Sequence, residues 1–244
     1  MIWLKEQTEK HKNNFETFRE KYLKGENGSS SIADIQNNKR RCATLVHKVN
    51  STELNKVREE LQGIEGFYSQ EIPHFTIDCH RYLTDDRLPD YINAISLEEQ
   101  KENLITEEEL KSYDKILREI IGNEKFYDFE LKGVAIGGDG LIAQVWFDYE
   151  RMNEMTSRLG EKVRSEIPTM DFQWGIVKHN VPIRVLNLTR FTGDEDKNKV
   201  LEYVDKNKNR LIGNFSMRGL DLLASDHYIQ KKNTLELGKY DFKI

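Results

Sequence analysis

Apolar positions along the chain recur at two spacings, every three to four residues and every two residues. The first spacing predicts helices and the second predicts strands, so the pattern indicates helices interleaved with strands. Residues 3–24 show the helical spacing, with Lys and Glu between the apolar positions, and we expect an amphipathic helix there. The spaced positions are His11, Phe15, Phe18 and Tyr22.

A Gly- and Ser-rich stretch, residues 25–31, follows this helix and predicts a flexible connector. We therefore expect residues 1–40 to form an N-terminal unit that packs either on the main body or on a partner. The main body would comprise residues 41–244. Within it, the acidic and irregular segment 81–104 is expected to be an insert or a lid.

Strand-like segments outnumber helical ones in the main body, and most neighbouring strands are expected to be antiparallel. This pattern predicts an α+β fold. Ser51 and Thr106 lie where a helix N-cap is expected. The expected strands are 42–49, 66–71, 74–80, 126–136, 141–148, 181–191, 211–223 and 228–242, and the expected helices are 51–64, 106–121, 152–163 and 194–207.

A run of small residues, Gly137-Gly138-Asp139-Gly140, separates two strongly alternating segments. Such a run between strands is typical of a hairpin turn. A phosphate-binding loop would need a Lys-Ser/Thr pair and the start of a helix immediately afterwards, and neither follows here. We therefore interpret this run as a turn.

Two short segments carry the most informative chemistry. Residues 72–79 place His74 and Thr76 on one face of a strand, and residues 183–191 place Asn187 and Thr189 on one face of another. An imidazole beside a hydroxyl can move a proton while the hydroxyl holds a phosphoryl oxygen. The second segment has Asn where the first has His.

These segments, in this order of elements, resemble those of the two-histidine (2H) phosphoesterase superfamily, which includes RNA 2′,3′-cyclic phosphodiesterases and 2′-5′ RNA ligase-like proteins. The resemblance extends roughly over residues 41–242. It implies two similar antiparallel lobes around a central groove, with one motif from each lobe and no metal or cofactor. By this resemblance, His74 and Thr76 form one half-site, Thr189 belongs to the other, and Asn187 occupies the position of the second histidine. The resemblance is carried by His74-Phe75-Thr76-Ile77, Asn187-Leu188-Thr189, the hairpin ending at residues 144–147, and residues 222–225 and 238–240.

An asparagine side chain has no titratable proton, so Asn187 cannot act as an acid or a base. Losing one general acid–base partner typically costs about 10²–10⁴ in rate. His179 and His47 are candidate replacements, and we also expect His179 and Tyr228 to contact the substrate. Arg190 follows Thr189 directly, so strand parity would turn its side chain away from the site unless a bulge intervenes.

Composition limits the partners. The 244 residues carry a net charge of −5, which argues against a binder of duplex DNA. No apolar run is long enough to predict a membrane span, and the N-terminus does not resemble a secretory signal. Only two cysteines occur, and neither CxxC nor HExxH spacing is present, so we expect a cytoplasmic protein without a metal site.

Three functions remain open from the sequence. The protein is a phosphodiesterase acting on a nucleotide or RNA phosphodiester, a weakened relative that binds such a ligand without turnover, or an interaction protein that keeps only the fold. Hydrolysis that depends on His74 would indicate the first. Saturable binding without hydrolysis would indicate the second, and the absence of both would indicate the third.

Overall fold

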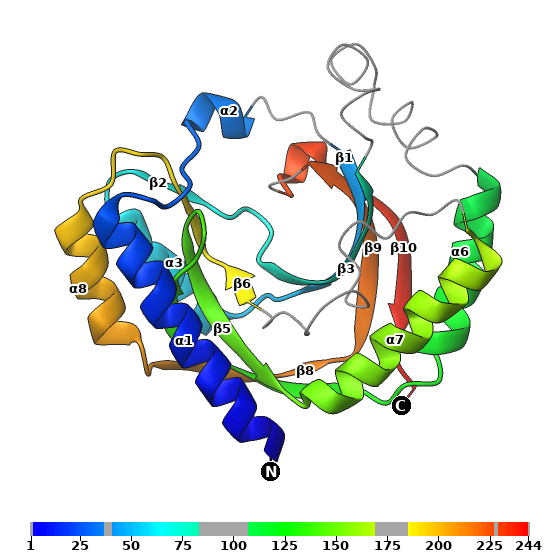
Figure 1. The fold of residues 1–244 in the computed structure, drawn as a ribbon. Coiled ribbons are helices and arrows are strands. Elements are labelled where there is room, and N and C mark those ends of the chain that lie inside the picture. Colours follow the sequence, from blue (N-terminus) through cyan, green and yellow to red (C-terminus); the bar gives the residue numbers. More distant parts are fainter. Residues whose placement is uncertain (1, 37–40, 83–106, 169–184, 227–228, 244) are drawn as a thin grey trace.

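A computed structural model describes residues 2–36, 41–82, 107–168, 185–226 and 229–243. Its strands form two four-stranded antiparallel sheets and one two-stranded sheet (Figure 1). The expected α+β class is therefore confirmed. The strands are β1 (Arg41–Lys48), β2 (Phe67–Ser69), β3 (His74–Tyr82), β4 (Tyr127–Ile136), β5 (Leu141–Phe147), β6 (Val185–Asn187), β7 (Thr189–Phe191), β8 (Leu211–Met217), β9 (Gly219–Asp226) and β10 (Leu235–Asp241).

The two larger sheets have matching layouts. The first has the order β10-β9-β1-β3 and the second has the order β6-β5-β4-β8, so each has a motif-bearing strand at one edge. These edge strands, β3 and β6, approach within 8 Å of one another between Cα atoms. The two-stranded sheet pairs β2 with β7.

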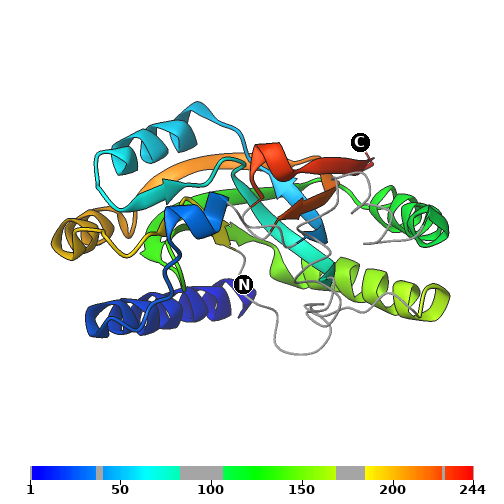
Figure 2. The ribbon, with the colours of Figure 1, turned by 90° about the horizontal axis from the view of Figure 1, so that it is seen from above.

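Helices cover the two sheets from different sides (Figure 1). Helix α6 packs against helix α7 and against β10 of the first sheet. In the second sheet, β4 is packed by helix α8 and β8 is packed by helix α3. Figure 2 shows α1 and α3 on opposite sides of the sheet layer. The helices are α1 (Ile2–Lys24), α2 (Ile32–Gln36), α3 (Thr52–Gln62), α6 (Glu107–Ile121), α7 (Tyr149–Glu166), α8 (Lys197–Asn207) and the short 3₁₀ helix η2 (Lys231–Asn233).

The hairpin predicted at residues 137–140 joins β4 to β5. The amide of Gly137 donates to the carbonyl of Gly140 at 2.7 Å and closes the turn. A Cβ on Gly140 would lie 1.9 Å from the carbonyl oxygen of Thr189. The hairpin tip therefore packs directly on the backbone of the second motif, which is why this position is glycine.

The amphipathic helix expected at the N-terminus is α1, and it lies across the second sheet. His11 and Tyr22 are buried, and Phe15 and Phe18 pack against the core. Nε2 of His11 donates to the carbonyl of Val145 at 3.2 Å, because that carbonyl can only accept. The apolar stripe read from the sequence is therefore the face that α1 buries.

The connector after α1 contacts both the first lobe, which is built on the sheet β10-β9-β1-β3, and the second lobe, which is built on the sheet β6-β5-β4-β8. Gly28 N donates to Gly138 O at 3.0 Å in the second lobe, and Ser30 N donates to Phe191 O at 3.1 Å. At its far end, α2 contributes the carbonyl of Ile35, which accepts from Nε2 of Gln230 in the first lobe at 2.6 Å. Several backbone groups of this polar stretch are thus bonded to the body, although the sequence predicted only a flexible link.

Three segments predicted as single strands contain breaks or other elements. Residues 211–223 divide at Arg218, where the chain leaves β4 in the second sheet and joins β1 in the first. Within the described part of 228–242, η2 precedes β10. Within the described part of 181–191, β6 ends at Asn187 and β7 begins at Thr189. Apolar and polar residues keep alternating through such changes of sheet, so the two-residue spacing of apolar positions does not reveal them.

Candidate functional site

His74 begins β3 and is a buried polar residue, with 4% of its surface exposed. Its Nδ1 lies 2.7 Å from the carbonyl oxygen of Ile72. A carbonyl only accepts, so Nδ1 carries the proton and the neutral ring has its lone pair on Nε2. The short turn before β3 thus sets the tautomer of the ring.

Burial lowers the pKa of His74 to about 4, the hydrogen bond to the Ile72 carbonyl opposes this, and the positive charge of Arg190 lowers the pKa further. The ring is therefore neutral at pH 7. A neutral imidazole with its lone pair on Nε2 can accept a proton there but has none to donate from that atom.

Thr76 and His74 lie on the same face of β3, and both pair with β1 without a shift in register between them. The intervening Phe75 points into the main core. Thr76 pairs with Val46, which belongs to a second, smaller apolar cluster with Leu223 and Ile229. The face of the sheet that carries His74 is therefore separate from the face that builds the main core.

Asn187 ends β6, where it pairs with Ile142 of β5. Ile142 and Asn187 lie on the same face because directly opposite residues in an antiparallel pair share a face. The approach of β6 to β3 brings the strands of the two motifs close together, one from each sheet.

Thr189 lies in a different sheet from Asn187. It is buried, and its Oγ1 accepts from the backbone N–H of Leu141 at 3.3 Å. That bond uses a lone pair and leaves the hydroxyl proton available to donate elsewhere. The roles expected for Asn187 and Thr189 remain predictions.

Strand parity gave an incomplete account of Arg190. Because the strand is interrupted at Leu188, Arg190 takes its orientation from β7, where it pairs with Tyr68 of β2. Its side chain is 9% exposed, its Nη1 donates to Oδ2 of Asp139 at 2.5 Å, and its charge acts on His74. Sequence reasoning allowed for a bulge at this point but had no signal for a change of sheet.

His47, a candidate to replace the second histidine, does not share the face of His74. It pairs with Phe75, and its ring contacts Phe75 and Phe129 in the main core. Its Nδ1 is bonded to the carbonyl of Gly219 at 3.1 Å. Parity places it on the opposite side of the sheet, so this candidate was wrong. The other expected contacts, His179 and Tyr228, and nearly all of the expected insert 81–104 lie outside the described residues.

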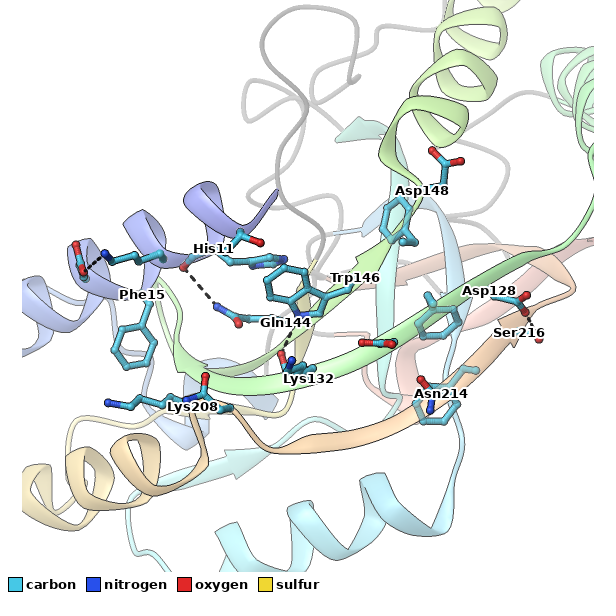
Figure 3. Close-up of a pocket in the computed structure, with 18 residues that line it drawn as sticks. His11, Phe15, Asp128, Lys132, Gln144, Trp146, Asp148, Lys208, Asn214 and Ser216 are labelled. Atoms are coloured by element: carbon cyan, nitrogen blue, oxygen red, sulfur yellow. Dashed lines mark hydrogen bonds and ion pairs between the residues drawn. The ribbon is translucent and has the colours of Figure 1, made fainter. Parts of the chain in front are cut away.

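A cavity of about 1090 Å³ lies between α1 and the strands β4, β5 and β8 of the second sheet (Figure 3). Aromatic side chains line it, among them Phe15 and Trp146, together with charged groups such as Lys132 and Asp128. Trp146 also packs against His11 with 4.3 Å between ring centroids. None of the four predicted motif residues lines this cavity.

The described residues contain no cluster of three His, Cys, Asp or Glu side chains arranged to hold a metal ion. Within the same residues, no helix combines the length and the apolar character needed to cross a bilayer.

No protein-family model and no curated protein sequence matches the chain. Among solved structures, TT0787 of Thermus thermophilus is similar over 82% of this chain and 97% of its own, with 14% identity and a TM-score of 0.51. E. coli LigT complexed with NADP+ aligns over 84% of this chain and 99% of its own, with 7% identity and a TM-score of 0.49. The likeness to TT0787 shows that the chain shares its fold, and the mixed helix and antiparallel-sheet architecture agrees with the one that the motif resemblance implied.

Proposed function

We propose that this protein hydrolyses a nucleotide or RNA phosphodiester without a metal ion, and that a 2′,3′-cyclic phosphate is the form it accepts. One observation carries the proposal. A buried imidazole of fixed tautomer, His74, begins an edge strand that approaches the edge strand of the other motif. A buried titratable ring with a strongly lowered pKa is a common mark of a functional site, and this supports a catalytic task for His74.

In the proposed reaction, Nε2 of His74 takes a proton from water while the water oxygen bonds to phosphorus. The bond from phosphorus to one ribose oxygen breaks, and the imidazolium returns its proton to that leaving oxygen. One ring thereby serves as base and then as acid. The hydroxyl of Thr76 and the amide of Asn187 donate hydrogen bonds to phosphoryl oxygens as their charge increases.

A second function is favoured by one residue. Asn187 occupies the position that the resemblance assigns to a second histidine, and it cannot transfer a proton. A protein with only one titratable group at the site would retain affinity for a phosphodiester with slow turnover or none. Binding of a nucleotide or an RNA end is therefore the alternative.

Incubation with the four 2′,3′-cyclic nucleotides, followed by separation of the products, tests both functions. Hydrolysis that falls to background in His74→Gln supports the enzyme, since glutamine fills the position without a titratable proton. Saturable binding measured by calorimetry, without product, supports the alternative. The absence of both product and binding with all four nucleotides rejects the two together.

A further inference from the structure

After the change of sheet at Leu188, Arg190 pairs with Tyr68 of β2, the strand that precedes the first motif in the chain. The chain that carries β2 continues directly toward His74, and it is bonded to the second motif along the way. Tyr68 pairs with Arg190, and the amide of Gln70 donates to the carbonyl of Leu188 at 3.0 Å. Gln70 precedes His74 by only a few residues, so these bonds constrain the position of Arg190 relative to the imidazole.

We propose that Arg190 is the phosphate-binding cation of this site and supplies the positive charge that Asn187 lacks. The proposal rests on the proposed function and assigns the contact with the phosphoryl group within it. A second histidine, when protonated, would bring charge to the phosphoryl oxygens as well as a proton. Arg190 would provide the charge alone, and proton transfer would be left to His74.

The contacts of Arg190 support this role. The guanidinium is largely buried, and a charge in such surroundings acts more strongly on a neighbouring anion than one in bulk water. Asp139 binds one end of the guanidinium fork through Nη1. A carboxylate partner of this kind orients the planar group, and an incoming phosphoryl oxygen would meet a preorganised donor.

Asp139 is itself held by the N-terminal connector. It lies in the hairpin turn, where Nδ2 of Asn27 donates to Gly137 O at 2.9 Å and Gly28 N donates to Gly138 O at 3.0 Å. The carbonyl of Asp139 also accepts from the amide of Phe191 at 2.8 Å. We therefore assign Asp139 as a positioning residue that acts through Arg190.

Arginine variants test the proposal. Arg190→Gln should lower kcat/KM for the hydrolysed cyclic nucleotide by about 10²-fold, the usual cost of removing one donor to a developing oxyanion, and Arg190→Lys should recover part of the loss. Asp139→Asn leaves the cation in place but loosens it, so about a tenfold loss is expected. Arg19 and Asp205 form an exposed ion pair at 2.9 Å on another surface, and Arg19→Gln and Asp205→Asn are the matched controls.

A second readout does not depend on turnover. The imidazole of His74 is titrated by NMR with and without inorganic phosphate. Loss of the positive charge in Arg190→Gln should raise the pKa of His74 and weaken the phosphate-induced shift, whereas Arg19→Gln should change neither. Circular dichroism spectra and thermal melts identify variants that have lost the fold, and Asp139→Asn then becomes the deciding variant.

The results separate this proposal from the proposed function. If the wild type hydrolyses a cyclic nucleotide while a folded Arg190→Gln keeps its kcat/KM and an unchanged pKa of His74, the role of Arg190 is rejected and the enzyme remains. If the wild type neither turns over a cyclic nucleotide nor responds to phosphate, the proposed function is rejected and the role of Arg190 with it.

Discussion

The two motifs are built differently, although their sequences look alike. His74 and Thr76 lie on one continuous strand in one sheet, and strand parity describes their common face correctly. Asn187 and Thr189 lie on two strands in two sheets, separated by Leu188. The shared face of the first motif could therefore be predicted from the two-residue alternation of a strand alone, and the arrangement of the second motif could not.

This difference changes which side chains approach the first motif. Thr189 bonds to Leu141 of β5, and the positive charge of Arg190 lowers the pKa of His74. On a continuous strand, the side chain of Arg190 would point away from the site. In the structure, its positive charge acts on the imidazole of His74. The same four-residue pattern can present different groups when its strand ends midway.

The largest expected effect separates the two motif positions. His74→Ala should reduce turnover by about 10²–10⁴, because it removes the titratable group, whereas Asn187→Ala should cost less than about tenfold. Steady-state kinetics on a cyclic nucleotide measure both. Equal losses in the two variants would mean that the motifs contribute alike and that Asn187 has a larger role than hydrogen bonding.

The hairpin tip offers a test of how the second motif is supported. Gly140→Ala should destabilise the protein on the order of 3 kcal/mol, since its Cβ would collide with the backbone of Thr189. Gly138→Ala is the matched control, because its Cβ would lie 3.9 Å from the nearest atom, Cε1 of Phe18. Chemical denaturation gives both values, and similar stabilities would show that the tip does not press on β7.

Acid should weaken the fold through two buried rings, His11 on α1 and His74 on β3. Burial lowers the pKa of His11 and of His74 to about 4, while the unfolded value is 6.5. Between pH 6.5 and pH 4 the unfolded chain binds more protons, so stability rises with pH across this window and is lost on acidification. By about pH 4, protonation of each ring should have lowered the free energy of unfolding by on the order of 2–3 kcal/mol relative to pH 7.

Unfolding free energies measured between about pH 4 and pH 7 test this expectation. His11→Gln and His74→Gln should each flatten the dependence, because each removes one of the two titrating rings. A pH dependence that neither substitution alters would assign the acid sensitivity to other groups.

The smallest expected effect is a gain. Asn187→His should raise kcat by about tenfold, less than the full value of an acid–base partner, because its position is not preorganised for proton transfer. Steady-state kinetics on the same cyclic nucleotide measure the change. An unchanged kcat in a folded variant would indicate that Asn187 does not face the reacting phosphate.

Much of the architecture was predictable from local pattern. The hairpin at Gly137–Gly140, the cap at Ser51 and the apolar stripe of α1 all follow from short-range rules, and each is present. The breaks at Leu188 and Arg218 were not predictable, since pairing with a distant strand decides them. His47 was misjudged for the related reason that its face is set by Phe75 across the strand pair.

The connector between α1 and α2 has a mechanical consequence. Its backbone is bonded to the hairpin of one lobe, to Phe191 and, through Ile35, to Gln230 of the other lobe. Swinging the lobes apart would require these bonds to break together. The choice of ligand would then depend on its size and shape more than on any hinge movement between the lobes. Cleavage of the chain between Gly28 and Ser31 should let the lobes separate more easily while leaving every motif residue unchanged.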